Sequence, residues 1–157
     1  MGLLSWLIPE NPEEFRKHKI AIEHALQQVN TIGSESSRRL DCLARELNPF
    51  DINDKIIIHN SIAKLYRESA AALTLVDITD CSVAFKKVFK KYIAVAVEMA
   101  EVWERARRIW NKIQEKGILP DLAAEIEKCQ QIGHELTLKE YSLLQELVAI
   151  AREYGIH

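Results

Sequence analysis

Apolar residues recur along the chain in alternating steps of four and three, the spacing that places a stripe on one face of an α-helix. The first stripe consists of Ile22, Leu26, Val29, Gly33, Ser36, Leu40, Leu43 and Leu47. Its phase is the same on both sides of the polar stretch NTIGSESS, residues 30–37. The pattern therefore predicts one continuous helix over 12–47, with Asn11 as its cap and Pro12 in its first position.

The same spacing predicts three more helices, over about 54–77, 81–116 and 121–154. Their stripes are Ile58, Ile62, Leu65, Ser69, Ala72 and Val76; Phe85, Phe89, Tyr92, Ala96, Met99, Trp103, Ala106, Trp110 and Ile113; and Leu122, Ile126, Cys129, Gly133, Leu136, Glu140, Leu143, Leu147 and Ile150. The third helix carries a second apolar stripe, so we expect it to be the most buried of the four.

Short polar turns separate the predicted helices. The capping candidates at these turns are Asp51, Asn53, Thr79 and Asp80, and Gly117 followed by Pro120 stops the third helix. Thr137 and Glu140 have the spacing of a capping box, so a kink near Gly133–Thr137 is an alternative for the fourth helix.

Four helices with short connections predict an all-α fold, namely an elongated antiparallel up-down four-helix bundle with coiled-coil-like heptad seams. This bundle is expected over 10–157 as one domain, after a short apolar segment over 1–9. The long helices would span roughly 50 Å at about 1.5 Å per residue.

Counting residues from the end of the bundle where the first helix finishes places five residues in one layer. These are Gly33, Ser36, Ser69, Trp103 and Gly133. We expect Trp103 to fill the space beside Gly33 and Gly133, so that Gly33→Leu would cost about 1–3 kcal/mol. The alternative is a ligand pocket at this level, with Met99 and His134 nearby, two residue types that can also ligate haem.

Composition is that of an ordinary globular protein. The chain has 157 residues, 48% apolar and 28% charged, and a net charge of −2, so nothing in the total charge indicates nucleic acid or an acidic membrane. Cys42, Cys81 and Cys129 are odd in number and far apart, which predicts reduced thiols and a cytoplasmic location. Cys81 would lie in the first turn of the third helix, where we expect a structural role.

The first residues, MGLLSWLIPE, are strongly apolar at Leu3, Leu4, Trp6, Leu7 and Ile8. The segment lacks the basic residues of a secretory signal, and it lacks the Ser or Thr of a myristoylation site. Full burial of such side chains is worth roughly 1.5–3 kcal/mol each, so we expect the segment to lie against something. The choices are the bundle end near Leu73, Leu75 and Ile78, a partner protein or second copy, and a membrane surface.

Charge is unevenly divided between the last two helices. The segment 81–116 carries nine Lys and Arg against four Glu, whereas 121–157 carries three against seven acidic residues. Lys86, Lys87, Lys90 and Lys91 stand together at i, i+4 spacing. One interpretation is that the basic helix lies beside the acidic one; the other is a basic face for phosphate, acidic protein or anionic lipid. The aromatic residues lie on the core stripe, which disfavours nucleic acid.

Motifs that carry chemistry are scarce. The chain has no Glu-x-x-His, no GxSxG, no phosphate-cradling glycine loop and no zinc-ligand spacing, so we expect neither a metal nor another cofactor. REYGIH places Arg152 and His157 in an R-x4-H arrangement, which resembles the R-x4-6-H motif of HEPN ribonucleases, themselves small helical bundles. The resemblance covers these two residues and implies ribonuclease activity.

The sequence favours a non-enzymatic interaction protein, an adaptor or a subunit of an assembly. It would engage a protein partner, or itself, through the apolar segment, the basic face of the third helix, or both. Two alternatives remain: a peripheral membrane protein anchored by residues 1–8, and a HEPN-like ribonuclease or nucleic-acid-binding bundle.

Overall fold

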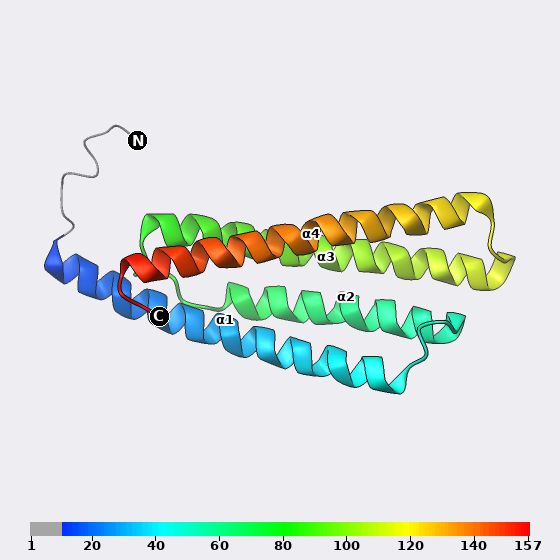
Figure 1. Ribbon diagram of the computed structural model, residues 1–157, viewed down its shortest axis with the longest axis horizontal. Coiled ribbons are helices and arrows are strands. Elements are labelled where there is room, and N and C mark those ends of the chain that lie inside the picture. Colours follow the sequence, from blue (N-terminus) through cyan, green and yellow to red (C-terminus); the bar gives the residue numbers. More distant parts are fainter. Residues whose placement is uncertain (1–10) are drawn as a thin grey trace.

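The computed structural model describes residues 11–157, in which four helices run alternately up and down an elongated bundle (Figure 1). They are α1 (Pro12–Glu46), α2 (Ile52–Thr74), α3 (Val83–Lys116) and α4 (Pro120–Glu153). The described residues contain no strand. The predicted all-α four-helix bundle is thus confirmed.

Local capping chemistry explains where α1 and α2 begin. The side chain of Asn11 accepts a hydrogen bond from the Glu13 backbone N–H at 2.9 Å, and Pro12 occupies the first helical position. Asp51 accepts in the same way from the Asp54 backbone N–H at 3.0 Å, so α2 begins two residues earlier than expected.

The start of α3 differs from the prediction. Neither Thr79 nor Asp80 caps it; the Ser82 hydroxyl instead accepts a hydrogen bond from the Phe85 backbone N–H at 3.2 Å, and α3 begins at Val83. Cys81 therefore precedes the helix and does not lie in its first turn. The prediction misplaced the boundary because several consecutive residues in this turn can act as caps.

Both long helices that contain a glycine in their stripe are continuous. α1 passes through Gly33 without interruption, as the unchanged phase predicts. α4 likewise continues through Gly133–Thr137. Thr137 is not a cap, because its hydroxyl donates to the Gly133 carbonyl at 2.9 Å within the helix. The continuous helix is thus confirmed, and the alternative of a capping box with Glu140 and a kink is wrong.

One end of the bundle has a core to which all four helices contribute. Its buried residues are Ile22, Ala25, Val29, Leu73, Val76, Cys81, Phe85, Phe89, Leu147, Ala151 and Tyr154. Phe85 and Phe89 stack at 6.0 Å between ring centroids and are almost fully buried. α3 contributes nine buried residues along its length, more than any other helix, as its second stripe predicts.

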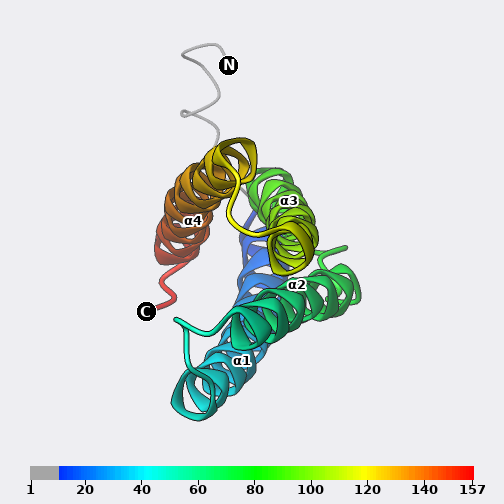
Figure 2. The ribbon, with the colours of Figure 1, turned by 90° about the vertical axis from the view of Figure 1, so that its right-hand side faces the viewer.

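In the rest of the bundle the apolar core is formed by α2, α3 and α4, without buried residues of α1. The buried residues of its two clusters are Ala106, Ile109, Ile113, Ile126 and Cys129, and Val95, Met99, Leu136 and Leu143. Figure 2 shows the second half of α1 lying beside α2 and away from α4. Leu40, Leu43 and Leu47 of this half are accordingly only half-buried. The bundle is therefore closed at one end and open between α1 and α4 at the other.

Candidate functional site

The opening between α1 and α4 contains a cavity. We call it the waist pocket; its volume is about 700 Å³ and its walls come from all four helices. Its apolar lining is Val29, Ile32, Leu40, Leu65, Leu73, Ala96 and Leu144. The pocket exists because α1 leaves the shared core after Val29, so that no helix covers the inner faces of α2, α3 and α4 at this level.

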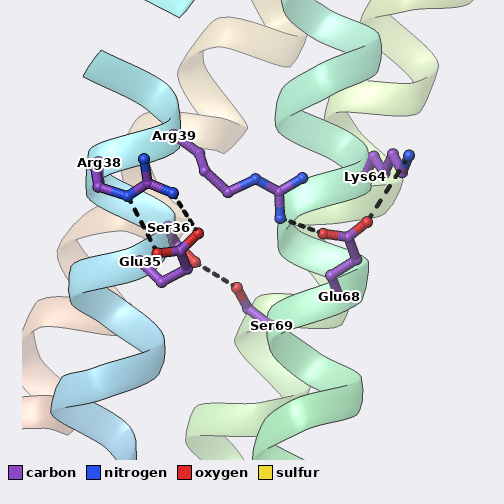
Figure 3. Close-up of polar contacts among 7 residues, drawn as sticks. All are labelled: Glu35, Ser36, Arg38, Arg39, Lys64, Glu68 and Ser69. Atoms are coloured by element: carbon purple, nitrogen blue, oxygen red, sulfur yellow. Dashed lines mark hydrogen bonds and ion pairs between the residues drawn. The ribbon is translucent and has the colours of Figure 1, made fainter. Parts of the chain in front are cut away.

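Polar contacts hold α1 to α2 along one edge of the waist pocket (Figure 3). The hydroxyls of Ser36 and Ser69 share a hydrogen bond of 2.8 Å across the two helices. Arg39 pairs with Glu68 at 2.5 Å, and Lys64 lies 3.9 Å from the same carboxylate. Exposed ion pairs contribute little stability individually, but the Arg39–Glu68 pair and the serine pair together fix the register of α1 on α2, whereas Lys64 and Glu68 belong to the same helix.

The lining of the pocket also includes a carboxyl and two phenol groups. Glu140 of α4 is half-buried, and burial raises the pKa of its carboxyl. Tyr66 of α2 and Tyr92 of α3 are also half-buried. Burial, and after it the negative charge of Glu140, raise the pKa of both phenols, that of Tyr92 to about 12. A titratable group in a mostly apolar cavity is a typical feature of binding sites.

The predicted single waist layer is wrong, because its members lie at two levels. Gly33, Ser36 and Ser69 line the pocket, whereas Met99, Trp103 and Gly133 do not. Ala96, which does line it, precedes Trp103 by seven residues, or about 10 Å along α3. Counting residues from the helix ends assumes that the ends of neighbouring helices lie at the same height in the bundle. This assumption fails because α1 diverges from α4, and because the connection over 75–82 allows α2 and α3 to be shifted along each other.

Trp103 packs against only one of its two expected glycines. A Cβ atom on Gly133 would lie 3.5 Å from Cζ2 of Trp103, whereas one on Gly33 would meet nothing within 4 Å. Met99 is buried in the α3–α4 core and His134 is exposed. These two residues therefore do not face a common cavity, and the haem interpretation is wrong.

A second aromatic cluster lies between α2 and α3 beside Trp103. The His59 ring is 5.3 Å from Trp103 and 6.3 Å from Trp110, and Lys55 lies 4.6 Å above the Trp110 ring. Burial lowers the pKa of His59, while its Nδ1 is 2.6 Å from the Lys55 carbonyl oxygen. With the ring held by packing and one backbone contact, we assign this cluster a structural role.

The basic residues predicted on the third helix lie on its surface. Lys87, Lys90 and Lys91 are exposed, and Lys86 is half-buried. None of the nine Lys and Arg of α3 forms an ion pair within residues 11–157, and none of the seven acidic residues of α4 does. The two helices pack side by side, yet most of their charged side chains are exposed, Lys86, Arg107 and Glu140 being among the half-buried ones.

Three predicted sites remain: Cys81, the pair Arg152 and His157, and the apolar segment over 1–8. Burial raises the pKa of the Cys81 thiol to about 11, which fits the expected structural role. Arg152 and His157 are exposed, α4 ends between them, and they form no hydrogen bond with each other. Nothing in this arrangement favours ribonuclease activity. Leu3, Leu4, Trp6, Leu7 and Ile8 fall outside the described residues.

Sequence reasoning missed the three groups that define the pocket chemistry, Glu140, Tyr66 and Tyr92. A signal was present, because Glu140 occupies a stripe position between Leu136 and Leu143 where an apolar residue is expected. Tyr66 lies off the predicted stripe of its helix and gave no such signal.

Within residues 11–157, no three His, Cys, Asp or Glu side chains are grouped closely enough to hold a metal ion. None of α1–α4 combines the length and apolar character that crossing a bilayer requires. No protein-family model matches the chain, and neither a curated protein nor a solved structure matches it.

Proposed function

We propose that the chain is a non-enzymatic interaction protein, an adaptor or a subunit of a larger assembly. The basic face of α3, consisting of Lys86, Lys87, Lys90 and Lys91, binds an acidic protein surface. The observation that supports this proposal is that, within residues 11–157, none of the nine Lys and Arg of α3 and none of the acidic residues of the neighbouring α4 forms an ion pair. The apolar segment over 1–8 provides a second contact to the same partner.

Electrostatics favours such a partner. Lys86 and Lys90, like Lys87 and Lys91, are like-charge neighbours at i, i+4 on one helix, and each such pair is mildly unfavourable. An acidic surface placed over them relieves this repulsion and accelerates association. A second copy of the chain offers such a surface in its α4, which carries a net charge of −4 from three Lys/Arg and seven Asp/Glu over 121–157.

The test uses the full chain, with poly-L-glutamate and the chain itself as probes. Self-association is followed by sedimentation velocity, and polyglutamate binding by calorimetry, at 25 and 300 mM NaCl. The variant Lys87→Glu/Lys90→Glu/Lys91→Glu changes three exposed residues of the basic face. Its control, Arg45→Glu/Lys128→Glu/Lys139→Glu, makes the same change in net charge at exposed positions on α1 and α4.

We expect the natural chain to bind at least one probe at 25 mM NaCl. This binding should be lost at 300 mM NaCl, because salt screens interactions between surface charges beyond a distance of less than about 10 Å. The basic-face variant should lose binding and the control should retain it. If the basic-face variant and the control lost binding equally, the net charge of the chain and not the basic face would explain the loss. An absence of binding to both probes would contradict the proposal.

One observation favours the membrane alternative. Leu75 and Val83, at the α2–α3 turn, are 86% and 81% exposed, and Val83 precedes Lys87 by one helical turn. Exposed apolar side chains beside lysines are typical of surfaces that bind anionic lipid. Flotation with phosphatidylserine vesicles tests this function with a deletion of residues 2–8 and with Leu75→Ser/Val83→Ser. Flotation that both changes abolish would support the membrane function over the first.

A further inference from the structure

The waist pocket contains an acidic group, Glu140, for which the described residues supply no counter-charge. None of the described residues donates a hydrogen bond to the Glu140 carboxyl or forms an ion pair with it. Arg38 is the only basic residue among those described that line the pocket. Both of its hydrogen bonds, of 3.2 and 2.8 Å, go to the carboxylate of Glu35.

The hydroxyl groups nearest the pocket edge do not satisfy Glu140 either. Ser36 and Ser69 bond to each other at 2.8 Å across α1 and α2. Asp41 also lines the pocket and adds a second negative charge at its rim. With Arg38 neutralised by Glu35, the charges left for an occupant are therefore both negative.

The pocket also has aromatic and aliphatic walls, beside the polar residues Asn30, Ser34 and Ser37 of α1. Tyr66 and Tyr92 come from two different helices, and both sense the charge of Glu140. Leu65, Leu73 and Leu144 supply aliphatic walls. A volume of about 700 Å³ lies in the range of small-molecule sites, and aromatic rings beside a carboxylate are the usual surroundings of a bound ammonium group.

We propose that the waist pocket binds a small organic cation, an amine with an apolar body, whose ammonium group pairs with Glu140 and whose body packs against Tyr66, Tyr92 and the leucines. This site is separate from the basic face of α3 and does not rest on the proposed function. The cation supplies the hydrogen-bond donors that Glu140 lacks, and the open side between α1 and α4 provides the entrance.

Proton linkage gives the site a recognisable signature. Burial raises the pKa of Glu140, and a cation beside it favours the ionised carboxylate. Binding therefore releases protons in the pH range where the free protein still holds part of one at Glu140. The affinity for the cation should rise with pH through that range and then become constant.

The experiment compares three probes with one shared body: 4-phenylbutylamine, the neutral 4-phenylbutanol and the anionic 4-phenylbutanoate. Calorimetry on the full chain at pH 7.5 should give a Kd on the order of 1 mM or tighter for the amine. The alcohol should bind at least about tenfold more weakly, because it brings no charge to Glu140. The butanoate should not bind.

The substitution Glu140→Gln should weaken binding of the amine at least about tenfold and leave the affinity for the alcohol unchanged. Glu146→Gln, on the exposed surface of the same helix and outside the pocket lining, is the matched control and should bind as the natural chain does. Equal affinity for amine and alcohol, or an unchanged amine affinity in Glu140→Gln, would overturn the proposal.

Two further measurements do not depend on a variant. Amide shifts induced by the amine should be largest over 29–41, 65–73 and 140–144, which contain most of the pocket lining; shifts confined to other regions would overturn the site. A helical peptide with one central lysine provides the last comparison. If it bound through Glu140 at least tenfold more tightly than the amine, the occupant would be a partner's lysine and the small-molecule proposal would be wrong.

Discussion

At the scale of single residues, the two glycines of the helix stripes have different surroundings. Gly133 faces Trp103 at ordinary van der Waals distance, and Gly33 faces open space. Both lie within continuous helices, where glycine costs roughly 0.5–1 kcal/mol relative to alanine. The expectation that a larger residue at Gly33 would overpack the core is therefore wrong.

We predict that Gly33→Ala raises the free energy of unfolding by about 0.5–1 kcal/mol, because it gains helix propensity and meets no neighbour. Gly133→Ala should gain no more than this, and Gly133→Leu should lose about 1–3 kcal/mol through contact with Trp103. Urea denaturation measures all three variants. A loss of stability in Gly33→Ala would contradict the open surroundings of this residue.

Glu140 is the residue whose charge opposes folding. Its pKa is raised from the ordinary 4.5 by burial, so the folded state holds a proton more tightly than the unfolded state does. Stability should therefore fall as pH rises from about the ordinary pKa through the raised one, and the full cost should be present above it.

We predict that Glu140→Gln stabilises the chain by on the order of 1 kcal/mol at pH 7, because it removes a half-buried, unpaired charge. The gain should become small near pH 4, where the carboxyl is mostly protonated in both states. Denaturation curves at the two pH values, with Glu146→Gln as the exposed control, measure it. A gain that is the same at both pH values would show that the charge of Glu140 is not its cause.

At the scale of elements, α1 is one helix in two environments. Ile22, Ala25 and Val29 of its first half are buried in the core that all four helices share. The second half contacts α2 through the serine pair, the Arg39–Glu68 ion pair and half-buried leucines. A helix with so little apolar burial opens locally at lower free energy than the core does.

Amide hydrogen exchange should therefore divide α1 near Val29, with slow exchange over 20–29 and faster exchange over 36–46. For the same reason, Ile22→Ala should lower the free energy of unfolding by about 2–5 kcal/mol, because this side chain is fully buried. Leu43→Ala should cost clearly less, because Leu43 is half-exposed. Uniform protection along α1 would mean that its second half is covered in solution by something besides α2.

At the scale of the whole molecule, a small net charge conceals two strongly charged helices. The chain has a net charge of −2 at pH 7 and an isoelectric point near 6.2. The segment 81–116 has a net charge of +5, from nine Lys and Arg and four Glu. The segment 121–157 has a net charge of −4, from three Lys and Arg and seven Asp and Glu. Near pH 6 the net charge of such a molecule is close to zero, so two copies no longer repel each other at long range, while the basic and the acidic face both remain charged.

We predict that light scattering in 20 mM salt is largest near pH 6 and that 300 mM NaCl reduces it, because salt screens the attraction between unlike faces of two copies. Lys87→Glu/Lys90→Glu/Lys91→Glu should remove this maximum. Scattering that rises with salt would instead indicate association through apolar surfaces, with Leu75 and Val83 as the first candidates.

The sequence by itself determined the helices and most of the core. The four-three spacing needs only the geometry of one helix, so it predicted the continuity of α1 through Gly33, the burial of α3 and the all-α bundle correctly. Capping was less certain where several candidates adjoin, as at Thr79, Asp80 and Ser82, because small energy differences choose among them.

Only the tertiary structure decided how the helices lie against one another. A stripe shows which face of a helix is buried, but neither how far one helix is shifted along its neighbour nor whether it follows that neighbour to the end. α1 leaves α4 after Val29, and this divergence placed Gly33 and Trp103 at different levels. The same divergence brought Glu140, Tyr66 and Tyr92 to one cavity, because a cavity depends on distances between helices that no periodicity along a single helix contains.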